Sequence, residues 1–126
     1  MSNLGIDKYV RQIQKVSEDD LPSVYAAADV VVMPSLLEGF GFPVLEAFAV
    51  GVPVAASRNW SLRDFPDDLL ESAGSGGPEE LEGAVRKVLD DMERSRARAA
   101  RARAWARQWT WERVARGAAR AYGARV

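Results

Sequence analysis

The segment SLLEGFGFPVLEAFAVG, residues 35–51, predicts a turn that faces a ligand, followed by a helix. A short apolar run precedes it at residues 28–33 and ends at Pro34, as a buried strand that enters a loop does. A second short apolar run follows at residues 53–57. Strands that alternate with helices favour a parallel sheet in an α/β fold, and ligands bind beyond the carboxyl ends of such strands.

Glycine and proline mark both ends of the predicted helix. Gly39 and Gly41 permit positive φ angles in the turn, or a closer approach by a ligand than a side chain would allow. Pro43 suits the first helical turn and Gly51 suits the helix end. The N-terminus of this helix aims unpaired amide hydrogens and the positive end of the helix dipole beyond the strand, which favours a phosphate group there.

Two glutamates flank the start of this helix. Glu38 lies in the turn and Glu46 lies about one turn into the helix, with seven residues between them. A carboxylate repels a phosphate but is a strong acceptor for hydroxyl groups. Hydroxyl groups and phosphate together indicate a nucleotide sugar. Each glutamate also has a structural alternative, Glu38 as a loop cap that bonds nearby amides and Glu46 as a favourable charge in the first helical turn.

This combination of residues resembles the donor-site signature of retaining glycosyltransferases with two Rossmann-like domains (GT-B fold), often called family 4. The matching positions are Pro34-Ser35, Glu38-Gly39-Phe40-Gly41, Pro43, Leu45-Glu46-Ala47 and Gly51-Val52-Pro53-Val54. The match is specific because glutamates, glycines and prolines occur at fixed spacing between flanking strands in the right order. Residues 20–35, DLPSVYAAADVVVMPS, and the closing Thr110-Trp111-Glu112 resemble the same family.

The resemblance implies a role for each residue of the turn. Glu38, the candidate catalytic residue, would contact the sugar hydroxyls of the donor, and Glu46 would bind its ribose. The implied amide contacts are those near Gly39, Phe40 and Gly41 for the sugar and those around Val44 and Leu45 for the phosphate. The implied reaction transfers a sugar from a nucleotide-diphosphate donor to an acceptor with retention at the anomeric carbon, with no cofactor and no metal bound by the enzyme.

The composition narrows the chemistry further. The chain of 126 residues has no cysteine and no histidine, which removes disulfides, a thiol nucleophile, the usual general base and the usual metal ligand. It has no run of 18 apolar residues and no signal-peptide pattern, so we expect a cytoplasmic protein without an integral membrane segment. The formal net charge of −1 predicts no nucleic-acid partner, although residues 1–93 carry a net −10 and residues 94–126 a net +9.

Two further elements are predicted before the turn. Residues 9–16 alternate imperfectly and contain β-branched side chains, which predicts an edge strand. Ser17 suits the cap of a helix that runs to Ala27. The predicted buried stripe of this helix consists of Leu21, Val24 and Tyr25.

After the second apolar run, residues 58–68 form a loop at the edge of the sheet where a ligand would bind. Its candidate border residues are Arg58, Asn59, Trp60 and Ser61. The alternative is a polar loop without any ligand contact, as many loops are. Residues 69–72 predict a weak edge strand, and a glycine-rich linker follows at residues 74–78.

The remainder of the chain is predicted to be helical, with an apolar face in a helix at residues 78–93. A second helix is predicted at residues 94–108 and is rich in arginine and alanine. One interpretation of this composition is a helix that binds a membrane surface or a nucleic acid. Its arginines surround the helix and it lacks large aliphatic side chains, so we expect a solvated surface helix. Thr110 suits the cap of a last helix. The face of that helix comprises Trp111, Val114, Ala118 and Ala121, and the tryptophans Trp105, Trp109 and Trp111 are expected to fill a core or a domain contact.

We therefore expect residues 1–126 to form a partial Rossmann-like, three-layer α/β domain with a parallel sheet, helices on both faces and a helical C-terminus. The resemblance covers only the later part of the family's second, donor-binding domain. Two strands of that domain, a basic pair that neutralises the donor diphosphate, and the acceptor-holding first domain have no match here. In the family's sheet order the missing strands lie between residues 9–16 and residues 30–33. We expect self-association or a partner chain to supply them, and little activity from the chain alone.

Two functions follow from these observations. The first is the donor-binding portion of a glycosyltransferase whose partner is a nucleotide sugar. The second is a non-catalytic α/β interaction or oligomerisation domain, which keeps the turn for structural reasons and uses its tryptophan-rich end as a contact surface. The sequence leaves the donor base, the sugar and the acceptor open.

Overall fold

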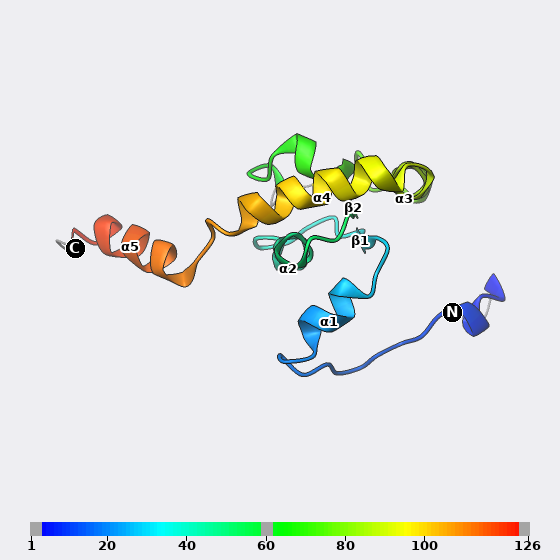
Figure 1. Ribbon diagram of the computed structural model, residues 1–126, viewed down its shortest axis with the longest axis horizontal. Coiled ribbons are helices and arrows are strands. Elements are labelled where there is room, and N and C mark those ends of the chain that lie inside the picture. The colour runs from blue at the N-terminus through cyan, green and yellow to red at the C-terminus, as the bar shows by residue number, and fades with distance from the viewer. Residues whose placement is uncertain (1–3, 59–61, 124–126) are drawn as a thin grey trace.

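The computed structural model describes residues 4–58 and 62–123, and within them it contains a three-stranded parallel sheet with helices around it (Figure 1). The strands are β1 (Val31–Met33), β2 (Val54–Ala56) and β3 (Glu71–Ser72), in that order across the sheet. All neighbouring strands are parallel. Their carboxyl ends therefore lie at one edge, as the sequence predicts.

The central strand β2 shows that both faces of the sheet are covered. Its register pairs Val31 with Val54 and Ala55 with Glu71, and every residue of β2 is buried. Val54 and Ala56 belong to one hydrophobic cluster, whereas Ala55 belongs to another. Successive residues of a strand point to opposite faces, so each cluster marks one face. This confirms the predicted three-layer α/β architecture, in which a parallel strand is buried on both sides.

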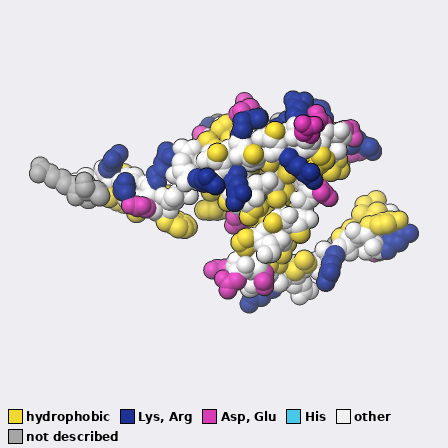
Figure 2. All heavy atoms as spheres, viewed as in Figure 1, with side chains coloured by type: hydrophobic (Ala, Val, Ile, Leu, Met, Phe, Trp, Pro, Cys, Tyr) yellow, Lys and Arg dark blue, Asp and Glu magenta, His cyan; other side chains and the backbone are white. Residues whose placement is uncertain are grey.

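Helix α2 (Phe42–Val50) covers the first face, and α4 (Met92–Ala106) packs along α2. The buried residues of α4 lie at spacings of four and three and are Ser95, Ala99, Ala102 and Ala106. The prediction of a solvated surface helix is wrong for this stripe, because small side chains allow two helices to approach closely. The opposite side of α4 carries exposed arginines, as Figure 2 shows in dark blue.

Helix α3 (Pro78–Asp90) covers the second face, where Ala84 and Val88 pack against Ala55. The predicted apolar face of this helix is confirmed. The boundary between α3 and α4 lies earlier than predicted, because the Asp91 side chain accepts a hydrogen bond from the Arg94 amide (3.0 Å) and caps α4 at that point.

The first helix, α1 (Leu21–Ala26), is shorter and more exposed than predicted. The Ser17 hydroxyl accepts a hydrogen bond from the Asp20 amide (3.1 Å), so Ser17 closes a turn that precedes the helix. No residue of α1 is buried, and Val24 is 42% exposed. The predicted buried stripe is therefore wrong, since α1 packs against α2 through half-buried side chains.

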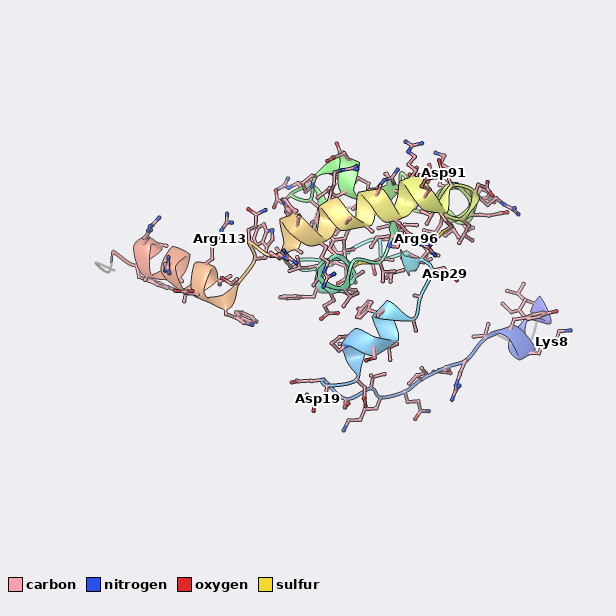
Figure 3. All side chains as sticks on the ribbon, in the orientation of Figure 1. Lys8, Asp19, Asp29, Asp91, Arg96 and Arg113 are labelled. Atoms are coloured by element: carbon pink, nitrogen blue, oxygen red, sulfur yellow. The ribbon has the colours of Figure 1, made fainter. Side chains whose placement is uncertain are left out.

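Residues 9–16 form no strand, which corrects a second prediction. A short 3-10 helix covers Asp7–Tyr9. The chain that follows it, between the labelled Lys8 and Asp19, lies apart from the sheet (Figures 1 and 3). Ile13 is 55% exposed. A strand requires a neighbour for its amides and carbonyls. Among the described residues β1 pairs with β2 alone, so its outer edge remains open.

The last helix, α5 (Trp111–Ala121), extends from the opposite end of the molecule (Figure 1). The Thr110 hydroxyl accepts from the Arg113 amide (3.2 Å), which confirms the predicted cap. No residue of α5 is buried, and the Trp111 side chain on its apolar face is 80% exposed. Trp105, in contrast, contacts the rings of Phe48 and Phe65 in the core, as expected for a tryptophan that fills a core.

Candidate functional site

Three loops leave the carboxyl ends of the strands and touch one another. The Ser57 amide donates to the Met33 carbonyl (3.0 Å), and the Arg58 amide donates to the Gly74 carbonyl (2.9 Å). A Cβ atom placed on Gly76 would lie 2.7 Å from the Cβ of Ser57 and 3.4 Å from the nearest Leu36 side-chain atom. The loop that carries Glu38 therefore lies at the edge where α/β sheets bind ligands.

Glu38 is half-buried in the loop after β1. One of its carboxylate oxygens accepts a hydrogen bond from the Ser35 hydroxyl at 2.7 Å. The loop thus restrains the Glu38 side chain through a neighbour three residues away. Among the described residues no other hydrogen bond to this carboxylate is present, so its second oxygen can accept from a hydroxyl group.

The turn before α2 uses its two glycines differently. Gly41 has φ of +93°, caps α2 and is buried. Gly41 thus has the positive φ angle that was one of the two alternatives for these glycines. Gly39 does not, and since an added Cβ there would meet nothing within 4 Å, its close approach by a ligand stays a prediction. At the other end Gly51 has φ of +82° and closes the helix as predicted.

The amides at the start of α2 fall into two groups. The amides of Val44 and Leu45 both donate to the Gly41 carbonyl, at 3.0 and 3.2 Å. The amides of Gly39, Phe40 and Gly41 donate to no carbonyl within the described part of the chain. Since Pro43 has no amide hydrogen, the amides of this turn without a carbonyl partner lie before it. The side chain of Val44 is wholly buried in the core.

Phe40 has a packing role that the sequence did not predict. Its ring centroid lies 5.2 Å from that of Phe42 and 5.7 Å from those of Phe65 and Trp109. These aromatic contacts link the turn to the loop after β2 and to the end of α4. The turn is therefore positioned by an aromatic cluster as well as by its glycines.

Glu46 lies one turn into α2, where the sequence placed it, and is half-buried. Its Oε2 atom accepts a hydrogen bond of 2.7 Å from the hydroxyl of Tyr25 on α1. Burial of the phenol raises the pKa of Tyr25, and the hydrogen bond to the Glu46 carboxylate and its negative charge raise that pKa further. Sequence reasoning assigned Tyr25 to a core stripe and missed this contact, because nothing local pairs two residues 21 positions apart.

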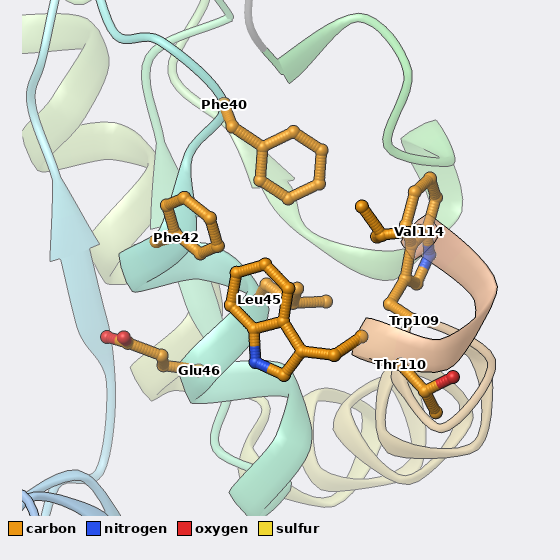
Figure 4. Close-up of a pocket in the computed structure, with 8 residues that line it drawn as sticks. Phe40, Phe42, Leu45, Glu46, Trp109, Thr110 and Val114 are labelled. Atoms are coloured by element: carbon orange, nitrogen blue, oxygen red, sulfur yellow. The ribbon is translucent and has the colours of Figure 1, made fainter. Parts of the chain in front are cut away.

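A cavity of about 760 Å³ lies between α2 and the start of α5 (Figure 4). Its lining residues are Phe40, Phe42, Leu45, Glu46, Trp109, Thr110, Trp111 and Val114. It brings together three of the predicted site residues, Phe40, Leu45 and Glu46. Glu38, Gly39, Gly41 and Val44 do not line it. The cavity is mostly apolar, and Glu46 supplies the one carboxylate among these lining residues.

Arg58, in the loop after β2, bonds to other residues that follow it in the same region of the chain. A terminal nitrogen of Arg58 donates to the Phe65 carbonyl (2.9 Å) and pairs with the Asp67 carboxylate. Asp67 begins a 3-10 helix, Asp67–Leu69, that follows the loop. Arg58 therefore lies at the predicted edge, but its charge is already paired with Asp67. The other three predicted border residues, Asn59, Trp60 and Ser61, lie outside the described residues.

Within residues 4–58 and 62–123, no three side chains of His, Cys, Asp or Glu gather closely enough to hold a metal ion. No helix in these same ranges is both long enough and apolar enough to cross a membrane.

Sequence comparison identifies the family. The model of the family described as "Glycosyl transferases group 1" matches residues 1–105. The chain is 36% identical to an O-antigen chain mannosyltransferase B of Escherichia coli over 82% of its own length and 27% of that protein. It is 35% identical to a D-inositol 3-phosphate glycosyltransferase of Salinispora tropica over 98% of its own length and 26% of that protein. The chain thus spans about a quarter of these relatives.

Solved structures with the same fold bind nucleotides. The chain resembles the Anabaena Alr3699/HepE protein in complex with UDP-glucose, with a TM-score of 0.73, 25% identity, and coverage of 85% of this chain and 30% of that one. The same Anabaena protein in complex with UDP gives a TM-score of 0.60 and 27% identity over 71% of this chain and 25% of that one. The loop geometry, the family match and these structures agree, and the chain belongs to the group 1 glycosyltransferases.

Proposed function

We propose that this chain is the donor-binding portion of a retaining glycosyltransferase of family 4, and that it binds a nucleotide-diphosphate sugar. The observation that carries the proposal is the placement of Glu38 and Glu46 on either side of the start of α2. Glu38 lies in a loop at the carboxyl edge of a parallel sheet, and Glu46 lies on the helix that starts directly after that loop. Membership of the group 1 family and the UDP-glucose complex of a related fold support the same assignment.

In this proposal each polar group has one partner on the donor. Glu38 accepts from hydroxyls of the transferred sugar, the amides of Gly39, Phe40 and Gly41 hold that sugar, and Glu46 binds the ribose. The phosphates sit at the N-terminus of α2 beside Val44 and Leu45, whose amides already donate to the Gly41 carbonyl, so the helix dipole rather than these two amides holds them. The positive end of the helix dipole then stabilises charge on the departing diphosphate without a bound metal or cofactor.

We also propose that transfer requires groups from outside this chain. The acceptor site and the basic pair for the diphosphate have no counterpart in the described residues, where Arg58 pairs with Asp67. Helix dipoles alone give weaker stabilisation than a full cationic site. The chain by itself should therefore bind the donor and show little transfer. The cysteine-free composition supports a location in the cytoplasm.

The first test is thermal unfolding with and without millimolar UDP, GDP, ADP and their sugar conjugates. A ligand that binds only the native state raises the unfolding temperature by mass action. We expect a shift with one base, and we expect Glu46→Ala to weaken that binding about 10- to 100-fold, the effect of losing hydrogen bonds to a charged acceptor. Glu82→Ala, which removes an exposed carboxylate of α3, is the matched control.

A second function, a non-catalytic interaction domain, is favoured by the exposed apolar face of α5. The same experiment separates the two functions. Lost nucleotide binding with an unchanged unfolding temperature in Glu46→Ala supports donor binding. A lower unfolding temperature in Glu46→Ala, together with no binding by either form, supports the interaction domain instead.

Self-association is a further part of the proposal. Within the described residues β1 has no neighbour on its outer side, and Val32 is 41% exposed. An open strand edge pairs readily with another chain. We expect sedimentation or light scattering to show a mass above that of one chain at micromolar concentration. A stable monomer throughout the micromolar range would contradict this prediction.

A further inference from the structure

Tyr25 and Glu46 make a polar contact between two helices that are otherwise joined by half-buried side chains. The Tyr25 hydroxyl lies 2.7 Å from Oε2 of Glu46, and both residues are half-buried. Among the described residues no group donates to Oε1, the second oxygen of this carboxylate. Tyr25 therefore binds one side of the Glu46 carboxylate and leaves its other side unoccupied.

We propose that Tyr25 is a positioning residue that orients the Glu46 carboxylate toward the ribose hydroxyls of the donor. This inference rests on the proposed function, in which Glu46 binds the ribose. Tyr25 itself has no contact with the donor. It acts through Glu46 by fixing Oε2 so that Oε1 faces the ligand in one orientation.

Physical chemistry supports this role in two ways. A glutamate side chain has three rotatable bonds, and an anchored carboxylate loses less conformational freedom when it binds a ligand. The phenol must also stay protonated in order to donate, and its pKa is raised by burial and by the neighbouring carboxylate. Tyr25 therefore remains a hydrogen-bond donor to Glu46 across the physiological pH range.

A purely structural role for Tyr25 is the competing explanation. In that case the hydrogen bond holds α1 against α2, and its loss changes stability without regard to the ligand's ribose. The positioning role instead predicts an effect that depends on the ribose hydroxyls. Nucleotides that differ only in these hydroxyls separate the two explanations.

The experiment measures the affinity of the wild-type chain and of Tyr25→Phe for UDP, 2′-deoxy-UDP and 3′-deoxy-UDP by calorimetry. If thermal unfolding selects another base, its three corresponding nucleotides replace the uridine series. We expect the wild-type chain to prefer the ribonucleotide over at least one deoxy form. We expect Tyr25→Phe to lower ribonucleotide affinity about 3- to 10-fold and to leave affinity for that deoxy form unchanged.

Three further variants complete the design. Tyr122→Phe alters a tyrosine that is 90% exposed and should change none of the affinities. Glu46→Ala should abolish the preference for ribose altogether. Glu46→Asp keeps the charge but draws the carboxylate away from Tyr25, so it should reduce the ribose preference even if Tyr25→Phe folds poorly.

The outcomes separate the positioning role of Tyr25 from the proposed function of the chain. An equal loss of affinity for all three nucleotides in Tyr25→Phe, or no loss at all, overturns the positioning role while the proposed function stands. A wild-type chain that binds nucleotides without any ribose preference overturns the positioning role and the assignment of Glu46 to the ribose, while donor binding by the chain stands. A wild-type chain that binds no nucleotide overturns the proposed function, and the positioning role falls with it.

Discussion

Replacing Phe48 by alanine is expected to lower the free energy of unfolding by about 3–5 kcal/mol, as for other large aromatic side chains removed from a core. Phe48 is 0% exposed. Its ring centroid lies 5.9 Å from that of Phe65 and 6.2 Å from that of Trp105. The substitution removes these contacts and leaves a cavity between α2, the loop after β2 and α4. Since small domains are stable by about 5–15 kcal/mol, the variant should lose a large part of its stability and unfold at a clearly lower urea concentration.

Urea unfolding followed by tryptophan fluorescence checks this prediction, because Trp105 lies against Phe48 and reports on the same core. Phe42→Ala is the matched control, since Phe42 lies on the same helix but is 53% exposed. We expect the control to change the unfolding free energy by less than about 1 kcal/mol. Similar values for the two variants would show that the core does not centre on Phe48.

Replacing Gly76 by alanine is expected to lower the free energy of unfolding by about 2–5 kcal/mol through two separate effects. Gly76 has φ of +87°, a left-handed conformation that costs a residue with a Cβ atom about 1–2 kcal/mol. Its added Cβ would also lie 2.7 Å from the Cβ of Ser57, closer than such atoms can approach. Ser57 is 1% exposed and cannot move aside without disturbing the end of β2, and such overpacking typically costs about 1–3 kcal/mol.

Gly83→Ala provides a control of opposite sign. Gly83 lies inside α3, and a Cβ atom there would meet nothing within 4 Å. Alanine favours a helix interior over glycine by about 0.5–1 kcal/mol, so this variant should be more stable than the wild type. Urea unfolding of both variants measures the contrast. A Gly76→Ala variant as stable as Gly83→Ala would mean that the turn at the site edge can rearrange freely.

The residues that predicted this fold correctly are those whose effect is local. Pro43 and Gly51 delimit α2 because each restricts or frees its own backbone, and Thr110 caps α5 through an amide three residues away. The apolar run at residues 53–57 becomes the buried strand β2. The spacing of Glu38 and Glu46 placed one on a loop and the other one turn into a helix for the same reason.

The wrong predictions concern segments whose state depends on a distant partner. Residues 9–16 have strand-like composition, yet no neighbouring strand in the described structure satisfies their backbone. The sequence predicts that the arginine-rich helix is solvated, but Ala102 and Ala106 are buried because they pack in one hydrophobic cluster with residues of α2. Burial of small residues leaves little hydrophobic pattern in a sequence, so the sequence favours neither side of such a helix.

The sequence by itself determined the strand, turn and helix around residues 35–51, the two glutamates at their spacing and the family to which the chain belongs. The tertiary structure alone decided that Tyr25 donates to Glu46, that Phe40 joins an aromatic cluster and that Gly76 packs on Ser57. Backbone conformation follows from neighbouring residues through sterics and hydrogen bonds. Side-chain partners far apart in the chain are chosen only when the whole sheet and its helices pack together.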